Sequence, residues 1–377
     1  MRILIEHTFH NPYNPEKITG GVERYCHQLW SLLRENGQEV VLAVPSDTDS
    51  RFVDGETVVY VDRLSKSGAK ALGKIASHKE WWTKIEQMSD SFDKVITNSE
   101  LSSLAIFDCV KLIPKMVHIN HFPFLATGCQ MAFRYLLCCH FIRENGGRVL
   151  SSGSLTREKA EQTWAKKKDV IAEHYASAYS KITGSQSTHD GDVDVNIFPS
   201  DMQPLAKSNG KRILAVGRPE PGKKLTVAVK TLAILSQEGW ECDMYITPYG
   251  KDFDQIVSLA SETSVKVHVK RPHQEIMEAF SKSDCLLFTS KDETNGMTAF
   301  EAAASGCTVF YQTPEPDHFL KPSKAGIWLE SFSPQGIAKQ ISGDLRPSSK
   351  TSIRSFFSSK YSNEAVANRI INQLTIG

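Results

Sequence analysis

Residues 285–304 read Cys-Leu-Leu-Phe-Thr-Ser-Lys-Asp-Glu-Thr-Asn-Gly-Met-Thr-Ala-Phe-Glu-Ala-Ala-Ala. The apolar run at 285–289 predicts a buried strand, and residues 297–304 are rich in helix formers. Glu293 and Glu301 therefore bracket a glycine-containing loop and the first turns of a helix. Backbone N–H groups at the start of a helix suit an anion, and carboxylates beside them can accept hydrogen bonds from hydroxyl groups of a ligand.

Strand and helix signals alternate along the whole chain, which predicts parallel sheets with helices on both faces. The first series of strands is expected at 3–6, 39–44, 57–61, 94–97, 115–119 and 148–151. The second series is expected at 213–216, 243–247, 266–269, 284–289 and 308–311. Helices are expected at 20–36 and 363–374. In two doubly wound halves of this kind, ligands bind outside the carboxyl ends of the strands.

The length of the chain, 377 residues, exceeds what one hydrophobic core usually serves, so we expect two domains. We place an N-terminal domain at 1–198 and a C-terminal domain at 199–359, because 199–211 has the composition of a linker. The last segment, 360–377, is expected to pack back on the first domain.

The composition, 40% hydrophobic and 23% charged, is typical of a soluble globular protein. A net charge of +1 excludes a globally basic nucleic-acid-binding protein. The eight cysteines form no C-x-x-C pair and several stand in apolar runs, which indicates a reducing compartment. The N-terminus enters a strand pattern at once, and no apolar run is long enough to span a bilayer. We therefore expect a soluble cytoplasmic protein without a transmembrane segment.

Residues 217–224, Gly-Arg-Pro-Glu-Pro-Gly-Lys-Lys, follow a predicted strand and allow three interpretations. The spacing fits the start of a nucleotide-binding P-loop, but Lys224 stands where that loop needs Ser or Thr for magnesium. Its two prolines also lack the N–H groups with which a P-loop holds phosphate. Alternatively, the segment is a solvated turn with a charge cluster, and its resemblance to a known family gives the third interpretation.

Three segments resemble GT-B glycosyltransferases, most closely the large retaining family 4. Residues 293–301 resemble its E-x7-E element, and residues 217–224 resemble its G-R…K-G segment. Gly20 and Gly21, followed by Val-Glu, resemble its G-G-x-E loop. The resemblance implies two Rossmann-like domains facing across a cleft. It also implies a nucleoside-diphosphate sugar as donor, with a UDP-sugar as the first expectation, and no further cofactor.

The resemblance implies a role for each matched residue. Arg218 would grip the donor diphosphate together with Lys223 or Lys224, a choice that stays open because the glycine usually following the lysine is missing. Fixed cations there would stabilise the charge that grows on the leaving diphosphate. The remaining implied donor contacts are Gly20 and Gly21 at the phosphate and reacting centre, Glu293 with the backbone of Asn295, Gly296 and Met297 at the sugar hydroxyls, and Glu301 at the ribose.

His121 follows the strand predicted at 115–119, which places it at the carboxyl edge. It resembles the histidine that closes the equivalent strand in many family members, where it contacts the sugar or the acceptor. His118 falls inside the strand and is expected in the core. A metal pair is disfavoured because no third ligand stands at suitable spacing, and the Asp-x-Asp run at 190–194 favours a solvated acidic turn.

The acceptor stays open. Lys66, Lys70 and Lys74 fall four residues apart, hence on one helical face, with Trp81 and Trp82 further along. Such a stripe can hold nucleic-acid phosphates or an anionic membrane surface, although most stripes are simply solvated. Lipids and polysaccharides are common acceptors in the family. Phage enzymes that glycosylate hydroxymethylated DNA bases also have this fold, which would place the protein in the host cytoplasm.

The expected function is retaining transfer of a hexosyl or pentosyl group from a nucleotide sugar to a hydroxyl acceptor. The family implies front-side transfer, in which the leaving phosphate helps to take the acceptor proton. Three alternatives remain: a nucleotide-sugar epimerase with the same fold, a P-loop nucleotide hydrolase, and a non-catalytic nucleotide-sugar binding protein.

Overall fold

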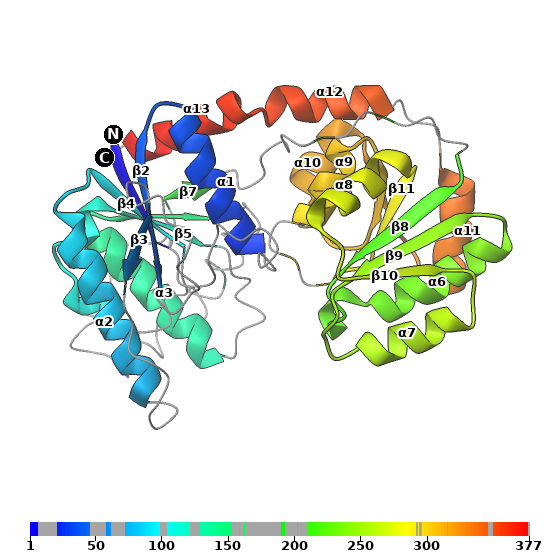
Figure 1. The fold of residues 1–377 in the computed structure, drawn as a ribbon, viewed down its shortest axis with the longest axis horizontal. Helices are drawn as coiled ribbons and strands as arrows, with labels where there is room; N and C mark the ends of the chain where they lie inside the picture. Colours follow the sequence, from blue (N-terminus) through cyan, green and yellow to red (C-terminus); the bar gives the residue numbers. More distant parts are fainter. Residues whose placement is uncertain are drawn as a thin grey trace. The chain divides into compact units, whose positions relative to one another are not determined.

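The computed structural model describes residues 1–6, 21–45, 58–61, 72–98, 104–120, 129–151, 158, 162, 190–192, 202, 205, 210–291, 293, 296–314, 316–345 and 350–375. The chain forms two compact units (Figure 1). Unit 1 comprises Met1–Val195 and Val366–Gly377, and unit 2 comprises Asn196–Ala365. Each unit is built around its own parallel sheet.

The sheet of unit 1 has seven strands in the order β3-β2-β1-β4-β5-β6-β7, and every neighbouring pair is parallel. The strands are β1 (Arg2–Glu6), β2 (Glu39–Pro45), β3 (Val58–Val61), β4 (Lys94–Thr97), β5 (Met116–Asn120), β6 (Arg148–Ser151) and β7 (Gly191–Asp192). Their apolar runs are buried because helices cover both faces of a parallel sheet. Ile3, Leu4 and Ile5 of the central strand, for example, are fully buried.

The helical elements of unit 1 are α1 (Gly21–Glu35), α2 (Leu72–Ser89), η2 (Leu104–Asp108), η3 (Ile113–Lys115), α3 (Cys129–Glu144) and, from the end of the chain, α13 (Asn363–Thr375). Gly37 ends α1, since its φ of 77° lies in the left-handed region that glycine tolerates best. Arg148 at the start of β6 donates through Nη2 to Oε1 of Gln373 in α13, at 3.0 Å. The last helix is thereby bonded to the first sheet.

The prediction that Trp81 and Trp82 accompany the lysine stripe on the surface is wrong. Trp81 and Trp82 are only 2% and 1% exposed and belong to the core beneath α2, so they offer no stacking surface. Spacing alone did not reveal this, because it does not show which face of a helix packs against the sheet. Lys66 and Lys70 lie outside the described residues, and Lys74 lies in α2.

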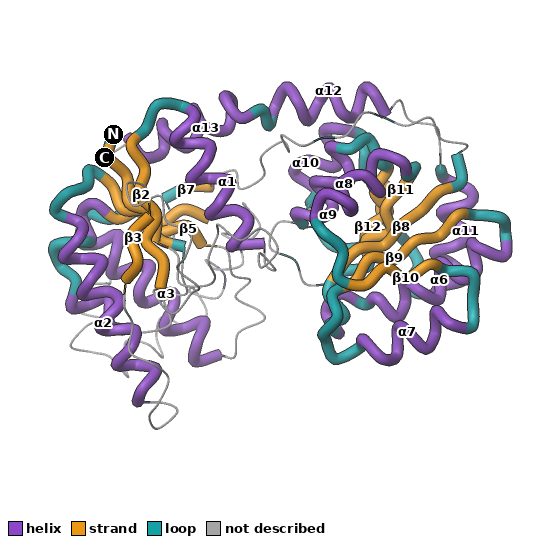
Figure 2. Tube along the Cα trace, in the orientation of Figure 1, coloured by secondary structure: helices purple, strands orange, loops and turns teal. Residues whose placement is uncertain are grey.

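The sheet of unit 2 has six parallel strands in the order β10-β9-β8-β11-β12-β13 (Figure 2). The strands are β8 (Arg212–Gly217), β9 (Glu241–Ile246), β10 (Lys266–Val269), β11 (Cys285–Phe288), β12 (Thr308–Tyr311) and β13 (Gly326–Trp328). The helical elements are η4 (Pro221–Lys223), α6 (Leu225–Gln237), α7 (Phe253–Ser261), α8 (His273–Lys282), α9 (Met297–Ala304), α10 (Asp317–Ser323), α11 (Pro334–Asp344) and α12 (Lys350–Lys360).

Two cores cover the two faces of this second sheet. On one face, the side chains of α6, α7 and α11 pack with alternate residues of the strands, such as Ile213 and Leu287. On the other face, α9, α10 and α12 meet through an aromatic cluster in which the rings of Phe319, Phe357 and Tyr361 surround Phe300 edge-on, at 4.9 to 5.4 Å. Both cores fix the helices whose first residues lie at the carboxyl ends of the strands.

All expected strands and the helices expected at 20–36, 297–304 and 363–374 are present, with bounds that differ by one or two residues at most. The Asp-x-Asp run, which we expected to be a solvated turn, begins with the exposed Asp190 and continues as a strand. Asp190 accepts hydrogen bonds from Arg143 Nε at 2.7 Å and from Val149 N at 2.8 Å, and the next two residues form the edge strand β7. No helix in the described parts of the chain is long and apolar enough to cross a membrane.

Candidate functional site

The carboxyl edge of the second sheet carries the sequence motifs. Strands β8 and β11 are parallel neighbours, so the loop after Gly217 and the loop after Phe288 leave the same edge. The first loop holds Arg218 and then the single turn η4, and the second leads to α9. Ligands of doubly wound sheets bind at this edge.

Lys223 and Glu293, 70 residues apart in the sequence, form a hydrogen-bonded ion pair between Nζ and Oε1. Their side chains are 32% and 13% exposed, so the pair lies at the surface of the edge rather than in the core. The neighbouring Lys224 points elsewhere, with its Nζ 5.3 Å from the ring centre of the exposed Phe332. The two lysines that the sequence leaves equivalent therefore have different partners.

The backbone of the lysine loop is held by the end of β11. The buried Thr289 places its hydroxyl 2.9 Å from the carbonyl oxygen of Lys223 and 3.2 Å from that of Lys224. Lys291 N donates to Gly222 O at 2.8 Å. Lys224 has a φ of 48°, a left-handed conformation that disfavours any residue with a Cβ. These contacts hold the turn in a conformation that its sequence alone would not choose.

Arg218 is exposed, and its side chain makes no hydrogen bond or ion pair with any described residue, whereas its carbonyl oxygen accepts from Glu220 N at 2.7 Å. The next residue, Pro219, is buried, and its carbonyl oxygen accepts from Asp252 N at 3.0 Å. Gly250 packs so closely on this carbonyl that an added Cβ would clash with it, and its φ of 140° also favours glycine. The guanidinium is thus available to a ligand, while the contacts of Pro219 with Asp252 and Gly250 fix the backbone next to it.

Glu301 lies in helix α9, which begins directly after the loop that carries Glu293. Gly296 precedes the helix with a φ of 65°, and Phe300 N donates to its carbonyl oxygen at 2.9 Å. The side chain of Glu301 is only 7% exposed, and its Oε1 lies 3.1 Å from Nε2 of His273, the first residue of α8. Sequence patterns did not single out His273, because only the packing of α8 against α9 brings the two residues together.

The other predicted site residues are placed as follows. Met297 is the first residue of α9, and Gly21 is the first residue of α1. His118 is fully buried, with Nδ1 2.9 Å from Oγ1 of Thr97, which confirms it as a core residue. Gly20, His121 and Asn295 lie outside the described residues, so their expected roles stay predictions.

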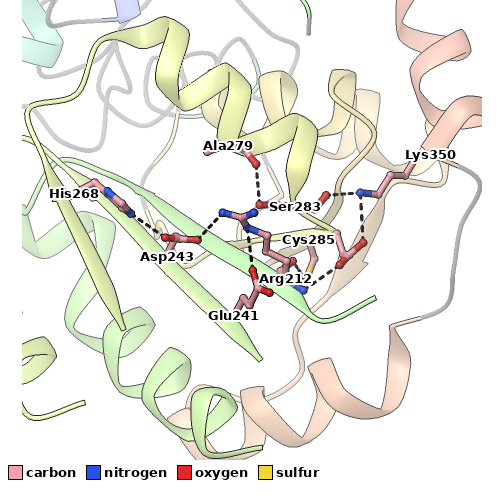
Figure 3. Close-up of polar contacts among 9 residues, drawn as sticks. Arg212, Glu241, Asp243, His268, Ala279, Ser283, Cys285 and Lys350 are labelled. Carbon is pink, nitrogen blue, oxygen red and sulfur yellow. Dashed lines mark hydrogen bonds and ion pairs between the residues drawn. The ribbon is translucent and has the colours of Figure 1, made fainter. Parts of the chain in front are cut away.

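The amino edge of the same sheet carries a separate charged network (Figure 3). Arg212 at the start of β8 pairs through Nη2 with Oδ2 of Asp243 at 3.3 Å, and Asp243 Oδ1 lies 2.8 Å from His268 Nε2. Asp284, just before β11, accepts from Arg212 N at 3.0 Å and pairs with Lys350 at 3.3 Å. We call these five residues the amino-edge network.

No set of three or more His, Cys, Asp or Glu side chains among the residues that the structure describes could hold a metal ion.

Comparison with known proteins gives two positive findings. Residues 198–345, which lie within unit 2, match the family described as Glycosyl transferases group 1. Solved structures match over the full length of the chain. The chain has a GT-B fold. No curated protein matches the sequence.

Three of the similar structures illustrate the GT-B fold. Sucrose-phosphate synthase from Thermosynechococcus elongatus has a TM-score of 0.70 at 13% identity, with 99% of this chain and 98% of that chain covered. HepE from Anabaena, in complex with UDP-glucose, has a TM-score of 0.66 at 14% identity, with 100% and 99% covered. An alpha-glucosyltransferase in complex with UDP and a 13-mer DNA has a TM-score of 0.61 at 13% identity, with both chains fully covered.

Proposed function

We propose that the protein is a glycosyltransferase that takes a nucleoside-diphosphate sugar on the carboxyl edge of unit 2. The observation that carries the proposal is the Lys223–Glu293 ion pair beside the exposed Arg218, within the segment that matches the glycosyltransferase family. A structural neighbour was crystallised with UDP-glucose, which makes UDP-sugars the first donors to test.

The chemistry follows from the two cations and the carboxylate. A diphosphate bound at Arg218 and Lys223 gains charge-assisted hydrogen bonds, and these strengthen as negative charge grows on the leaving group. Lys223 takes the phosphate role in this proposal because its ammonium faces Glu293, whereas Lys224 faces Phe332. Glu293, with the loop 295–297, then accepts hydrogen bonds from the sugar hydroxyls, and Glu301 accepts them from the ribose.

We further propose that transfer retains the anomeric configuration of the donor. The support is the family resemblance of the motifs around Gly20–Gly21, Arg218 and Glu293, and no side chain is assigned as a general base. In this scheme the leaving phosphate oxygen accepts the proton of the acceptor hydroxyl while the new bond forms on the same face. Proton NMR of the first product formed would show the configuration, and an inverted product would exclude the mechanism.

The acceptor is proposed to be a hydroxyl group on an anionic molecule, with hydroxymethylated DNA as the first case. The support is the DNA complex of one structural neighbour and the expected stripe of Lys66, Lys70 and Lys74. Each phosphate that a lysine neutralises releases counterions, so the acceptor KM should rise steeply with salt. A KM insensitive to salt would instead favour a neutral glycan or a small molecule.

The decisive experiment measures thermal shifts with a panel of nucleotide sugars and then offers hydroxymethylated DNA, lipid and glycan acceptors with the best donor. Sugar found on an acceptor establishes the transferase. Isomerised sugar without acceptor would indicate an epimerase, and magnesium-dependent release of phosphate would indicate a hydrolase. Donor binding with no turnover on any acceptor would indicate a binding protein. Absence of binding by any nucleotide sugar or nucleoside diphosphate would overturn the proposal.

A further inference from the structure

His273 and Glu301 form a histidine–carboxylate pair between two helices that start at the carboxyl edge of the second sheet. His273 is the first residue of α8 and Glu301 lies in the second turn of α9, with Nε2 and Oε1 3.1 Å apart. We propose that His273 positions Glu301 so that the site accepts ribonucleoside diphosphates and rejects their 2′-deoxy forms. This inference rests on the proposed function, in which Glu301 holds the ribose.

Burial explains why Glu301 needs a partner. An ionised carboxylate that is removed from water is costly unless charged groups or hydrogen-bond donors compensate it. Only 7% of the Glu301 side chain is exposed, whereas 36% of His273 is, so the histidine connects the carboxylate with the surface. An N–H donor at Oε1 selects one rotamer of a side chain that otherwise has three rotatable bonds.

A fixed carboxylate can recognise two neighbouring hydroxyl groups. It offers about four acceptor positions on two oxygens, and the N–H of His273 takes one of them. The 2′- and 3′-hydroxyls of a ribose stand side by side and can each donate to one carboxylate. A 2′-deoxyribose lacks one of these donors and leaves part of a buried, charged acceptor unpaired, which costs more than an unmade bond in water.

The expected discrimination follows from that asymmetry. Sites that bind a hydroxyl through buried polar groups reject the analogue lacking it far better than apolar pockets reject a missing methylene. We expect UDP to bind at least about tenfold more tightly than 2′-deoxy-UDP, the lower end for a lost hydrogen bond to a charged group. His273 acts through Glu301 in this scheme, so it is a positioning residue and need not touch the nucleotide.

The test measures Kd values for UDP and 2′-deoxy-UDP by calorimetry with the full chain. His273→Leu should raise the Kd for UDP by about tenfold and leave the Kd for 2′-deoxy-UDP nearly unchanged. The ratio of the 2′-deoxy-UDP Kd to the UDP Kd then falls toward one. His273→Gln should retain most of the ratio, because its amide nitrogen reaches about as far from the backbone as Nε2 and also donates. His273→Asn is too short to reach and should behave like His273→Leu, which provides a second variant if the leucine form does not fold.

The matched control is His268→Leu, which breaks a comparable pair with Asp243 at 2.8 Å in the same unit. It should leave the ratio of Kd values unchanged. Equal weakening of both ligands by His273→Leu, or a ratio near one in the wild type, would overturn the positioning role while leaving the proposed function intact. Loss of discrimination in His273→Gln as well would also count against it. If wild type binds neither ligand nor any other nucleoside diphosphate, the proposed function itself fails, and the inference fails with it.

Discussion

The two edges of the second sheet use charge in opposite ways. At the amino edge, the network of Arg212, Asp243, His268, Asp284 and Lys350 pairs every member with another member, at 2.8 to 3.3 Å (Figure 3). At the carboxyl edge, the exposed Arg218 has no such partner among the described residues. Charges that satisfy one another hold the strands together, whereas a charge on a fixed backbone without a partner is available to a ligand.

Carboxylates are largely buried at both edges, since the side chains of Glu301 and Glu293 at the carboxyl edge are 7% and 13% exposed, so exposure separates the edges through their cations, mainly through the exposed Arg218. The side chains of Asp243 and Asp284 are 7% and 10% exposed, so both carboxylates at the amino edge are largely removed from water. The side chain of Lys223 at the carboxyl edge is 32% exposed, and its pair with Glu293 can be opened at modest cost, as in other pairs near the surface. The amino edge should therefore govern stability and the carboxyl edge should govern binding and turnover, which mutations can test separately.

Mutations at the carboxyl edge should have the largest effect. Arg218→Ala and Lys223→Ala should each lower donor turnover by about a hundredfold or more, the usual loss when one preorganised contact to transition-state charge is removed. Thermal unfolding should change little, because the Arg218 side chain bonds to no described residue and Lys223 belongs to a partly exposed pair. Initial rates with a saturating acceptor measure the effect. Turnover near the wild-type value in both variants would contradict the diphosphate assignment.

Mutations at the amino edge should instead lower stability and leave nucleotide binding unchanged. Asp284→Ala removes the acceptor of Arg212 N and the ionic partner of Lys350, whose Nζ keeps its 2.7 Å bond to Ser283 O. We expect the free energy of unfolding to fall by about 3–5 kcal/mol, the range for breaking a largely buried pair. Urea denaturation measures this loss, and calorimetry should show an unchanged Kd for UDP. A weakened Kd with unchanged stability would invert the comparison.

Lys224 tests whether every lysine at the carboxyl edge matters for turnover, because it lies at that edge but its ammonium faces Phe332. Lys224→Gly relieves a left-handed conformation that costs roughly 1–2 kcal/mol and loses a cation–π contact of about 0.5–1 kcal/mol. The net change in stability should therefore be below about 1 kcal/mol, and turnover should be retained. The matched control is Lys230→Gly in the exposed interior of α6, which should cost about 1 kcal/mol. Loss of turnover in Lys224→Gly would return the phosphate role to this lysine.

The smallest effect is expected from alkylation of the amino-edge thiols. Burial raises the pKa of Cys307 from about 9 to about 12 and raises that of Cys285 well above its usual value. Both thiols should stay neutral and unlabelled by iodoacetamide at pH 8 until the protein unfolds. Because unfolded thiols ionise first, their contribution to stability is complete below about pH 9 and declines as the pH rises toward 12. Mass spectrometry of the native protein would detect any labelling.

The sequence was sufficient for most of the strands, because apolar runs and glycine-bounded loops are local signals, whereas the roles of the charged motifs stay predictions. It was insufficient wherever packing decided the outcome. Nothing in the sequence relates His273 to Glu301, or distinguishes Lys223 from Lys224, until helices and loops meet at the sheet edge. Trp81 next to lysines was assigned to a surface for the same reason, since spacing does not show which face a helix buries. The strand β13, three residues long, gave too short a pattern to recognise.

The return of α13 to unit 1 has a consequence for synthesis on the ribosome. Unit 1 contains Met1–Val195 and Val366–Gly377, so unit 2 is inserted between two parts of it. As the chain emerges, unit 2 has all of its residues before unit 1 receives Val366 and the helix that bonds to Arg148. Unit 1 therefore has all seven strands of its sheet, but lacks this helix, while the second unit folds. Released chains truncated after residue 365 should therefore resist proteases better in unit 2 than in unit 1.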